Sequence, residues 1–256
     1  MGIKIAGQIL KRNDLEFYDQ IARQWWQPSA KIYALHHLNP LRFQYFNRHI
    51  ANWSNLRVLD VGCGGGFSCE FIAARGAQVF GIDQSQNCIA TAQAHAAASG
   101  FEISYEYGFA ECLPYPANYF DVVLCVDVLE HVAQLKQTIA EIHRVLKPGG
   151  MFCFDTINRT WKSQIIMIWL LEEILQEIPL GIHDWKKFIK PEELKSLMQH
   201  SGFTDIEFKG FNLFGNTVWD YFVAYLHYKK TGGFSGKIND NTSVMYIGKA
   251  IKQQKV

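Results

Sequence analysis

Short apolar runs alternate with helical patterns through the middle of the chain. We predict strands at residues 58–61, 79–82, 103–107, 120–126 and 151–155, and those at 58–61 and 120–126 have the apolar character of buried parallel strands. We predict helices at 67–75, at the alanine-rich segment 87–99, and at 135–146, where apolar positions recur at helical spacing. Regular alternation of strand and helix is typical of a doubly wound α/β sheet whose strands run parallel.

Outside this region the alternation changes. Beyond residue 156 the pattern predicts an insertion over 161–188, a helix at 190–201, and two closing strands at 206–208 and 244–250. The closing strands are expected to form an antiparallel pair at the sheet edge, which gives seven strands in all. Helices are predicted at 13–26 and from Pro40 onward. We therefore expect a helical cover over 1–52 and one α/β domain over 53–256, with the insertion as a helical lid.

A glycine-rich turn follows the first strand, with glycines at 62, 64, 65 and 66. Backbone without Cβ atoms can approach a ligand closely, and the free N–H groups of the next helix suit a carboxylate or phosphate. Asp83 ends the second strand, twenty-one residues beyond Gly62. A carboxylate there can accept hydrogen bonds from two ribose hydroxyls. The pattern predicts a nucleoside site; the alternative is a turn that only lets helix and strand pack.

Composition narrows the class of protein. A chain of 256 residues that is 48% hydrophobic can build the core of one large domain. A net charge of +1 offers no electrostatic footprint for nucleic acid. Six cysteines without a C-x-x-C pair indicate reduced thiols in the cytoplasm. We expect no signal peptide, because residues 1–10 lack a long apolar core. The longest apolar run, 165–171, is far shorter than the ~20 residues of a spanning helix.

The glycine turn, Asp83 and the helix end Leu146-Lys147-Pro148-Gly149-Gly150 together resemble the class I S-adenosylmethionine-dependent methyltransferases, over residues 56–250. Dehydrogenases that share the glycine turn have no counterpart of the Leu-Lys-Pro-Gly-Gly segment. The resemblance implies a seven-stranded Rossmann-like methyltransferase sheet, mostly parallel with an antiparallel edge, and S-adenosylmethionine as the methyl donor.

A closer resemblance rests on five further motifs: Trp25-Trp26, His36 to Arg42, Leu129 to Val132, Thr156 to Arg159 and His183 to Pro191. These are similar to the ubiquinone-pathway O-methyltransferases, which methylate a hydroxyl of a polyprenylated phenol. The chain departs from that family over 212–241, which is longer and more aromatic. The resemblance implies a lipophilic phenol or quinol of the 3-demethylubiquinol type as the acceptor.

The same resemblance assigns cofactor contacts to Arg42, Asp60, Gly62, Gly64, Asp83, Ala110, Glu111 and Val126. It implies that the amino-acid end of the cofactor lies over the turn, with Arg42 beside its carboxylate. Asp83 would hold the ribose and the segment at Ala110 the adenine. Phe109 stands where many relatives carry an aspartate for the adenine amine, so adenine binding is expected to depend on backbone N–H groups and packing.

Asp127, Glu130 and His131 are the candidates for chemistry. A helical turn after the fourth strand would place all three on one face, at the edge where α/β sheets bind ligands. Two carboxylates and an imidazole can bind Mg²⁺, which would stabilise an ortho-dihydroxyphenyl substrate as its phenolate. Without a metal, His131 can act as the general base. A third interpretation is that Glu130 and His131 only cap the following helix and orient the cofactor loop. Family members carry Glu where this chain has Asp127.

The insertion is apolar at Ile165, Ile168, Leu171, Leu175 and Ile178, a spacing that predicts one helical face. We interpret 161–178 as a lid that covers a lipophilic substrate and rests on the membrane surface. Lysines 162, 186, 187 and 190 are expected near lipid headgroups. The alternative is an ordinary core helix beneath the C-terminal aromatic segment.

The sequence thus predicts a cytoplasmic O-methyltransferase, peripheral on the membrane, that acts on a phenolic hydroxyl of a prenylated quinone precursor. Alternatives that remain are methylation of a soluble small molecule or of carbon, a dehydrogenase, and a cofactor-binding module without turnover. A dehydrogenase would need a second mononucleotide-binding half, which this chain lacks.

Overall fold

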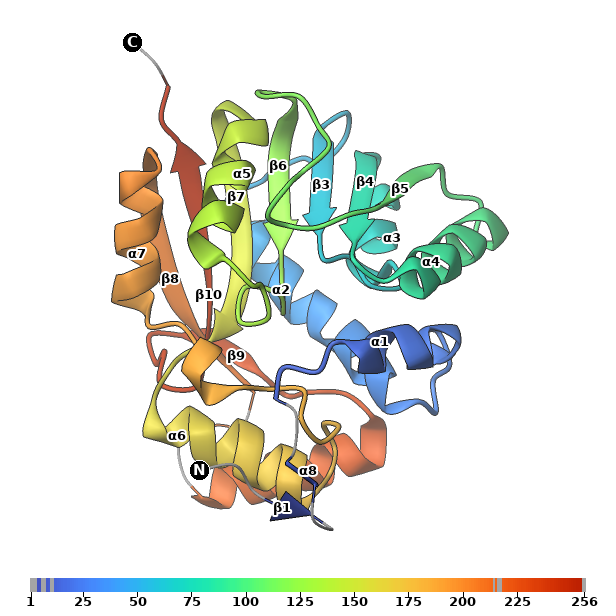
Figure 1. The fold of residues 1–256 in the computed structure, drawn as a ribbon, viewed down its shortest axis with the longest axis vertical. Helices are drawn as coiled ribbons and strands as arrows, with labels where there is room; N and C mark the ends of the chain where they lie inside the picture. The colour runs from blue at the N-terminus through green and yellow to red at the C-terminus, as the bar shows by residue number, and fades with distance from the viewer. Residues whose placement is uncertain (1–3, 6–7, 10–11, 214, 216–217, 255–256) are drawn as a thin grey trace.

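The computed structural model of the chain describes residues 4–5, 8–9, 12–213, 215 and 218–254. Its centre is an eight-stranded sheet of order β5-β4-β3-β6-β7-β10-β8-β9 (Figure 1). The strands are β3 (Arg57–Val61), β4 (Gln78–Asp83), β5 (Ile103–Tyr107), β6 (Phe120–Cys125), β7 (Leu146–Ile157), β8 (Phe203–Asn212), β9 (Lys237–Asn239) and β10 (Met245–Lys252). A separate two-stranded sheet pairs β1 (Lys4–Ile5) with β2 (Gln8–Ile9).

The direction of the strands confirms the predicted architecture. The strands from β5 to β7 run parallel, and β10 pairs antiparallel with both β7 and β8. The prediction of seven strands is one short, because the three-residue β9 pairs with the end of β8 at the edge of the sheet. The chain thus has the expected doubly wound sheet with an antiparallel edge.

Helices cover both faces of the sheet, and strand residues alternate between two cores. One core contains Val58 and Val122 together with buried side chains of α2 (Asn39–Phe46), α3 (Phe67–Ala73) and α4 (Gln86–Ala98). The other contains Leu59 and Val123 with α5 (Leu135–Val145) and α7 (Pro191–His200). This alternation follows from the period of two along a strand, and it explains why strands buried on both faces are continuous apolar runs.

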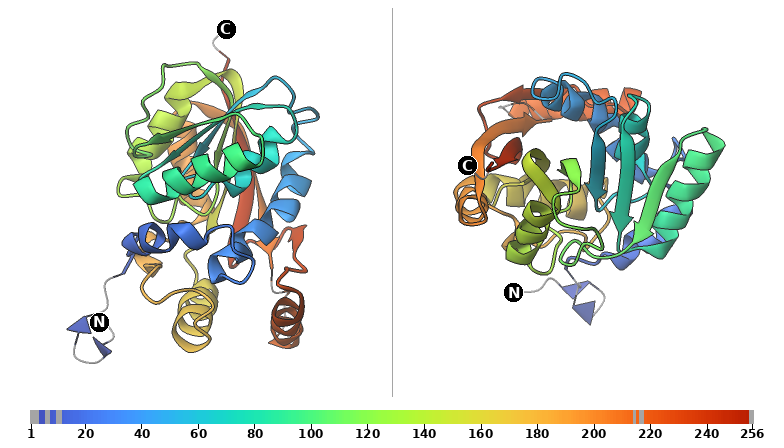
Figure 2. Two further views of the ribbon diagram at one scale, coloured as in Figure 1. Left: turned by 90° about the vertical axis from the view of Figure 1, so that its right-hand side faces the viewer. Right: turned by 90° about the horizontal axis from the view of Figure 1, so that it is seen from above.

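The N-terminal segment is less regular than predicted. The helix expected over 13–26 is the short α1 (Glu16–Ile21) followed by a 3₁₀ turn, η1 (Ala22–Gln24). A second 3₁₀ segment, η2 (Lys31–Leu38), leads into α2, where a proline occupies the first turn as predicted. These elements lie beneath the carboxyl ends of the parallel strands (Figures 1 and 2).

The insertion differs from the prediction in its geometry. After α6 (Trp161–Ser163) it continues as a π-helix, η3 (Gln164–Ile174), and it ends near a 3₁₀ turn, η4 (Trp185–Lys187). Because a π-helix bonds residues five apart, the spacing of three and four does not define its buried side. Ile166 and Leu171 are buried, whereas Ile165 is 43% exposed. The predicted single face that includes Ile165 is therefore wrong.

The sequence did not predict α8 (Val218–Thr231), which lies beside the insertion below the sheet (Figure 2). Its apolar side chains point to more than one side, so no amphipathic pattern marks it. Of the helices described, none is long and apolar enough to cross a membrane.

Candidate functional site

A cavity of about 860 Å³ lies at the carboxyl ends of the parallel strands. Its wall is formed by the glycine turn, the end of β4, the loop after β6, the N-terminal segment, the insertion and α8. Every residue predicted for cofactor binding or catalysis lines this one cavity, and Asp127 lines it too. The volume lies in the upper part of the ~300–1,000 Å³ range typical of small-molecule sites.

The glycine turn has the backbone conformation that requires glycine. Gly62, Gly64 and Gly66 have φ angles of 74°, 51° and 94°, and Gly66 caps α3 in the left-handed region. A Cβ atom built on Gly64 or Gly65 would lie 2.3 Å from an atom of the Trp25 indole. The N-terminal segment thus packs directly on the turn. The indole nitrogen of Trp26 fixes it there by donating to the Gly65 carbonyl oxygen at 2.7 Å.

Two carboxylates face the cavity beside this turn. Asp83 Oδ2 accepts a hydrogen bond from the Gly64 N–H at 2.9 Å, and Asp83 Oδ1 accepts one from the Ser85 N–H at 2.8 Å. Asp60 is 2% exposed and accepts a hydrogen bond from the Cys69 thiol. Burial raises the pKa of Asp60 to about 7. Among the described residues Asp60 Oδ1 has no hydrogen-bond partner, so it suits a cationic donor of a ligand.

Arg42 is buried on α2 and is held by two carboxylates. Its Nε donates to Asp155 Oδ2 at 2.5 Å, and its Nη2 donates to Asp127 Oδ2. Burial alone would lower the pKa of Arg42, but the two carboxylates outweigh it and the pKa is raised. The guanidinium is therefore a fixed cation at the cavity wall, with donors beyond the two used here.

Ala110, Glu111 and Val126 line the cavity on the side of β5 and β6. Glu111 Oε1 accepts hydrogen bonds from the N–H groups of Ala133 at 2.7 Å and Gln134 at 3.1 Å. Its carboxylate thus braces the loop before α5. The neighbouring Phe109 is 49% exposed, where it is available to pack against a flat ligand.

Asp127, Glu130 and His131 lie in the loop between β6 and α5. The predicted helical turn is wrong, because Asp127 has a φ of 55°, which is not helical. The loop instead contains a tight turn in which the His131 N–H donates to the Val128 carbonyl oxygen. Glu130 is buried and accepts a hydrogen bond from the Thr156 hydroxyl at 2.7 Å. Burial, and next the charge of Asp127, raise the pKa of Glu130 to about 8.

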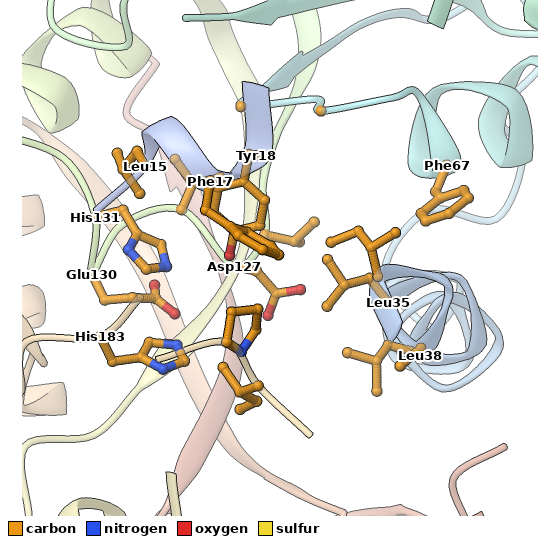
Figure 3. A pocket seen from close by; sticks show the side chains of 18 of the residues that line it. Leu15, Phe17, Tyr18, Leu35, Leu38, Phe67, Asp127, Glu130, His131 and His183 are labelled. Atoms are coloured by element: carbon orange, nitrogen blue, oxygen red, sulfur yellow. The ribbon is translucent and has the colours of Figure 1, made fainter. Parts of the chain in front are cut away.

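His131 is buried on the cavity wall next to His183 (Figure 3). Its ring lies 5.4 Å from that of His183, and its Nδ1 lies 2.8 Å from Asn13 Oδ1. Burial, His183 and Lys187 together hold the pKa of His131 well below its usual value. The ring is therefore neutral near pH 7. The sequence motif that contains His183 marked it, but nothing in the sequence marked Asn13.

The predicted metal set is not supported by the geometry. Asp127 pairs with Arg42, Glu130 with Thr156, and His131 with Asn13. Across the described part of the chain, no group of three or more His, Cys, Asp or Glu side chains is arranged to hold a metal ion. Spacing along the sequence placed the three residues in one loop, but their side chains have separate partners.

The other end of the cavity is apolar. Met167, Leu171 and Ile178 of the insertion line it, together with Tyr225 and Tyr228 of α8. The insertion and α8 are linked through Glu177, whose carboxylate accepts hydrogen bonds from the Tyr225 hydroxyl at 3.3 Å and from Lys229 Nζ at 3.0 Å. One cavity therefore joins a polar end at the glycine turn to an apolar end under the lid.

Known proteins with similar sequence are methyltransferases. Residues 59–154 match the model of a methyltransferase domain. The chain is 38% identical to a ubiquinone biosynthesis O-methyltransferase of Ruegeria pomeroyi, over 83% of this chain and 90% of the relative. It is 39% identical to one of Bartonella quintana, over 77% of this chain and 85% of the relative.

The fold also matches a solved methyltransferase. An N-methyltransferase of Haemonchus contortus, in complex with S-adenosylhomocysteine, superposes with a TM-score of 0.64 at 19% identity. The match covers 93% of this chain and 60% of that one. Together these findings confirm the predicted class of enzyme and its methyl donor: the chain belongs to the family of S-adenosylmethionine-dependent ubiquinone biosynthesis O-methyltransferases.

Proposed function

We propose that the protein transfers a methyl group to a phenolic hydroxyl of a prenylated quinone precursor. The observation that carries this proposal is the single cavity, polar at the glycine turn and apolar under the insertion and α8. A nucleoside cofactor suits the first end and a prenyl tail the second. The names of the curated relatives support an acceptor from ubiquinone biosynthesis.

Cofactor binding is assigned to the polar end. The free Asp60 Oδ1 receives the ammonium group, and Arg42 lies beside the carboxylate. Asp83 keeps lone pairs for the ribose hydroxyls beyond its two backbone hydrogen bonds. The backbone at Ala110 and the ring of Phe109 flank the adenine. Val126 contacts the methionine portion.

When bound, S-adenosylmethionine supplies a methyl group on a positively charged sulfur. The chain's task is to ionise the acceptor, because a free phenol has a pKa of about 10. His131 is neutral and would take the phenolic proton, while the methyl carbon would exchange its bond to the sulfur for one to the phenolic oxygen and S-adenosylhomocysteine would leave as the neutral thioether. Glu130, protonated below pH 8, is placed as a hydrogen-bond donor rather than a second base. The buried loop holds both groups in a site shielded from water.

The test is a transfer assay with labelled S-adenosylmethionine and an ortho-dihydroxyphenyl compound that carries a short prenyl tail. We expect one added methyl group, on oxygen, and activity that survives EDTA because the side chains predicted as ligands are engaged elsewhere. His131→Ala should lower kcat by roughly 10²- to 10⁴-fold, the usual contribution of a general base. A methylated carbon, or a rate that the prenyl tail does not affect, would favour the alternative substrates.

We also propose that the lid rests on a membrane surface. Trp161 and Trp169 of the insertion are 67% and 56% exposed, and Trp219 and Phe222 of α8 are 69% and 51% exposed. Large aromatic side chains exposed on two neighbouring helices suit the boundary between headgroups and acyl chains. Lys187 is wrongly assigned to the headgroups, since its Nζ donates to the carbonyl oxygens of His131 and Val132. Lys162, Lys186 and Lys190 keep that role.

A further inference from the structure

Asn13 contacts His131 through both atoms of its side-chain amide. Its Nδ2 donates to the backbone carbonyl oxygen of His131 at 3.0 Å, and its Oδ1 lies 2.8 Å from His131 Nδ1. The backbone of Asn13 has a φ of 56°, in the left-handed region that asparagine tolerates better than most residues. A residue 118 positions away in the sequence is thus brought against the imidazole.

The two hydrogen bonds fix where the imidazole proton lies. A carbonyl oxygen only accepts, so the amide nitrogen of Asn13 must face the His131 backbone, and its Oδ1 must face the ring. Because Oδ1 also only accepts, His131 Nδ1 carries the proton. Nε2 is left with a free lone pair, which is the form that a general base requires.

The residues on both sides of Asn13 anchor it to the insertion. Arg12 donates to the carboxylates of Glu172 at 2.5 Å and Glu173 at 2.6 Å. The N–H of Asp14 donates to the Gly181 carbonyl oxygen at 3.0 Å. Asn13 is therefore held in place from both sides.

We propose that Asn13 is a positioning residue that sets the tautomer and the ring orientation of His131. This rests on the proposed role of His131 as the base. Other groups pack around the ring, namely Tyr18 from α1 and His183 and Lys187 from the insertion. Among the described residues, Asn13 is the hydrogen-bond partner of His131 Nδ1.

The test uses two substitutions that suit the left-handed backbone. Asn13→Gly removes the amide without strain at φ. Asn13→Asp keeps an acceptor opposite Nδ1 and loses the donor to the His131 carbonyl oxygen. In the full-length protein labelled with ¹⁵N-histidine, NMR shifts of the ring nitrogens report the tautomer, and the spectrum of a His131→Gln variant identifies the signals.

We expect the wild type and Asn13→Asp to show the Nδ1–H form, and Asn13→Gly to gain the Nε2–H form. In Asn13→Gly, kcat should fall by about 10- to 100-fold, less than the ~10²–10⁴-fold of a whole general base. KM for S-adenosylmethionine should stay unchanged, because the cofactor end of the cavity is untouched. Asn13→Asp should retain most of kcat.

The two proposals fail differently. Full activity in His131→Gln would remove the base role, while the NMR spectra would still decide the role of Asn13. An Asn13→Gly protein that keeps the Nδ1–H form of His131 and wild-type kcat would overturn the positioning role. A rise in KM with unchanged kcat would also contradict it, since that result indicates a binding contact.

Discussion

At the residue scale, Asp60 links the protonation of the site to ligand binding. Burial raises the pKa of this carboxyl to about 7. Asp60 lines the cavity, and its Oδ1 has no hydrogen-bond partner among the described residues. Asp60 is therefore largely neutral at pH 6 and ionised at pH 8. A cationic ligand group would bind the ionised form and displace the proton.

Affinity for S-adenosylhomocysteine should consequently rise with pH. Because only the ionised fraction of Asp60 is competent, a pKa of about 7 predicts roughly tenfold tighter binding at pH 8 than at pH 6. Calorimetric titration at both pH values measures this. Asp60→Asn should bind more weakly and lose the pH dependence.

Asp240→Asn is the matched control, since Asp240 is an exposed carboxylate paired with Lys209 on the surface. It should behave as the wild type. Equal affinity at pH 6 and pH 8 in the wild type would show that Asp60 does not contact the ligand amine.

The sequence predicted those residues of the site that belong to a recognisable motif. The glycines, Asp60 and Asp83 belong to one strand-turn-helix-strand unit, so their neighbourhood follows from local order along the chain. Arg42 and Asp155 are 113 residues apart, and one sequence gives no signal of their ion pair. The same holds for Asn13 and His131, which explains why the sequence predicted a metal set where the structure has separate partners.

At the scale of elements, the N-terminal segment and the glycine turn form one packed unit. Trp25 covers Gly64 and Gly65, Trp26 stacks on His95 with ring centroids 3.6 Å apart, and Asp19 binds the Ser85 hydroxyl at 2.6 Å. The lack of a Cβ atom at these glycines thus allows Trp25 to pack on the turn, and it also allows a ligand to approach the backbone. Because Trp26 also contacts Phe67 of α3 edge to face, the segment is anchored to both α3 and α4.

Gly65→Ala should therefore destabilise the protein through Trp25. The new Cβ would lie 2.3 Å from Trp25 Cγ, and overpacking of this kind costs about 1–3 kcal/mol of unfolding free energy. Urea unfolding of the single and double variants measures the coupling. In a Trp25→Ala background the cost of Gly65→Ala should shrink by at least about 1 kcal/mol.

Gly233→Ala is a control, because its nearest neighbouring atom would be 3.7 Å away. We expect a change within about 0.5 kcal/mol for that variant. Additive costs for Gly65→Ala and Trp25→Ala would contradict the direct packing of the indole on the turn.

Elements with one clear period were predicted, and elements without one were not. β3 and β6 are largely apolar runs, and α5 and α7 each bury one face, so their positions follow from sequence. α8 lines the cavity with Tyr225 and Tyr228 but exposes Trp219, Phe222 and Leu226, which obscures its pattern. The insertion is a π-helix, and the spacing of its buried residues differs from the three-and-four spacing that predicts an α-helix.

At the scale of the whole molecule, the insertion and α8 lie below the sheet (Figure 2). They expose the aromatic side chains of Trp161, Trp169, Trp219 and Phe222. If this surface rests on lipid, a charge placed on it should weaken docking. Trp169→Glu is expected to lower the affinity for vesicles that contain anionic lipids by about tenfold or more, because a buried aromatic ring contributes ~1.5–3 kcal/mol.

Gln199→Glu adds the same charge on an exposed position of α7, away from that surface, and should float like the wild type. Equal recovery of Trp169→Glu and wild type in the vesicle fraction would argue against docking through the insertion. Transfer to a water-soluble catechol would separate loss of docking from loss of fold, because it should remain unchanged in Trp169→Glu.

The central claim is that the methyl donor lies across the carboxyl edge of the sheet, with its acceptor under the lid. A crystal structure of the protein with S-adenosylhomocysteine tests it most directly. We predict the ribose hydroxyls on Asp83, the amine on Asp60 Oδ1, and the sulfur directed toward His131. A nucleoside bound away from the glycine turn, or a sulfur directed away from His131, would contradict the account.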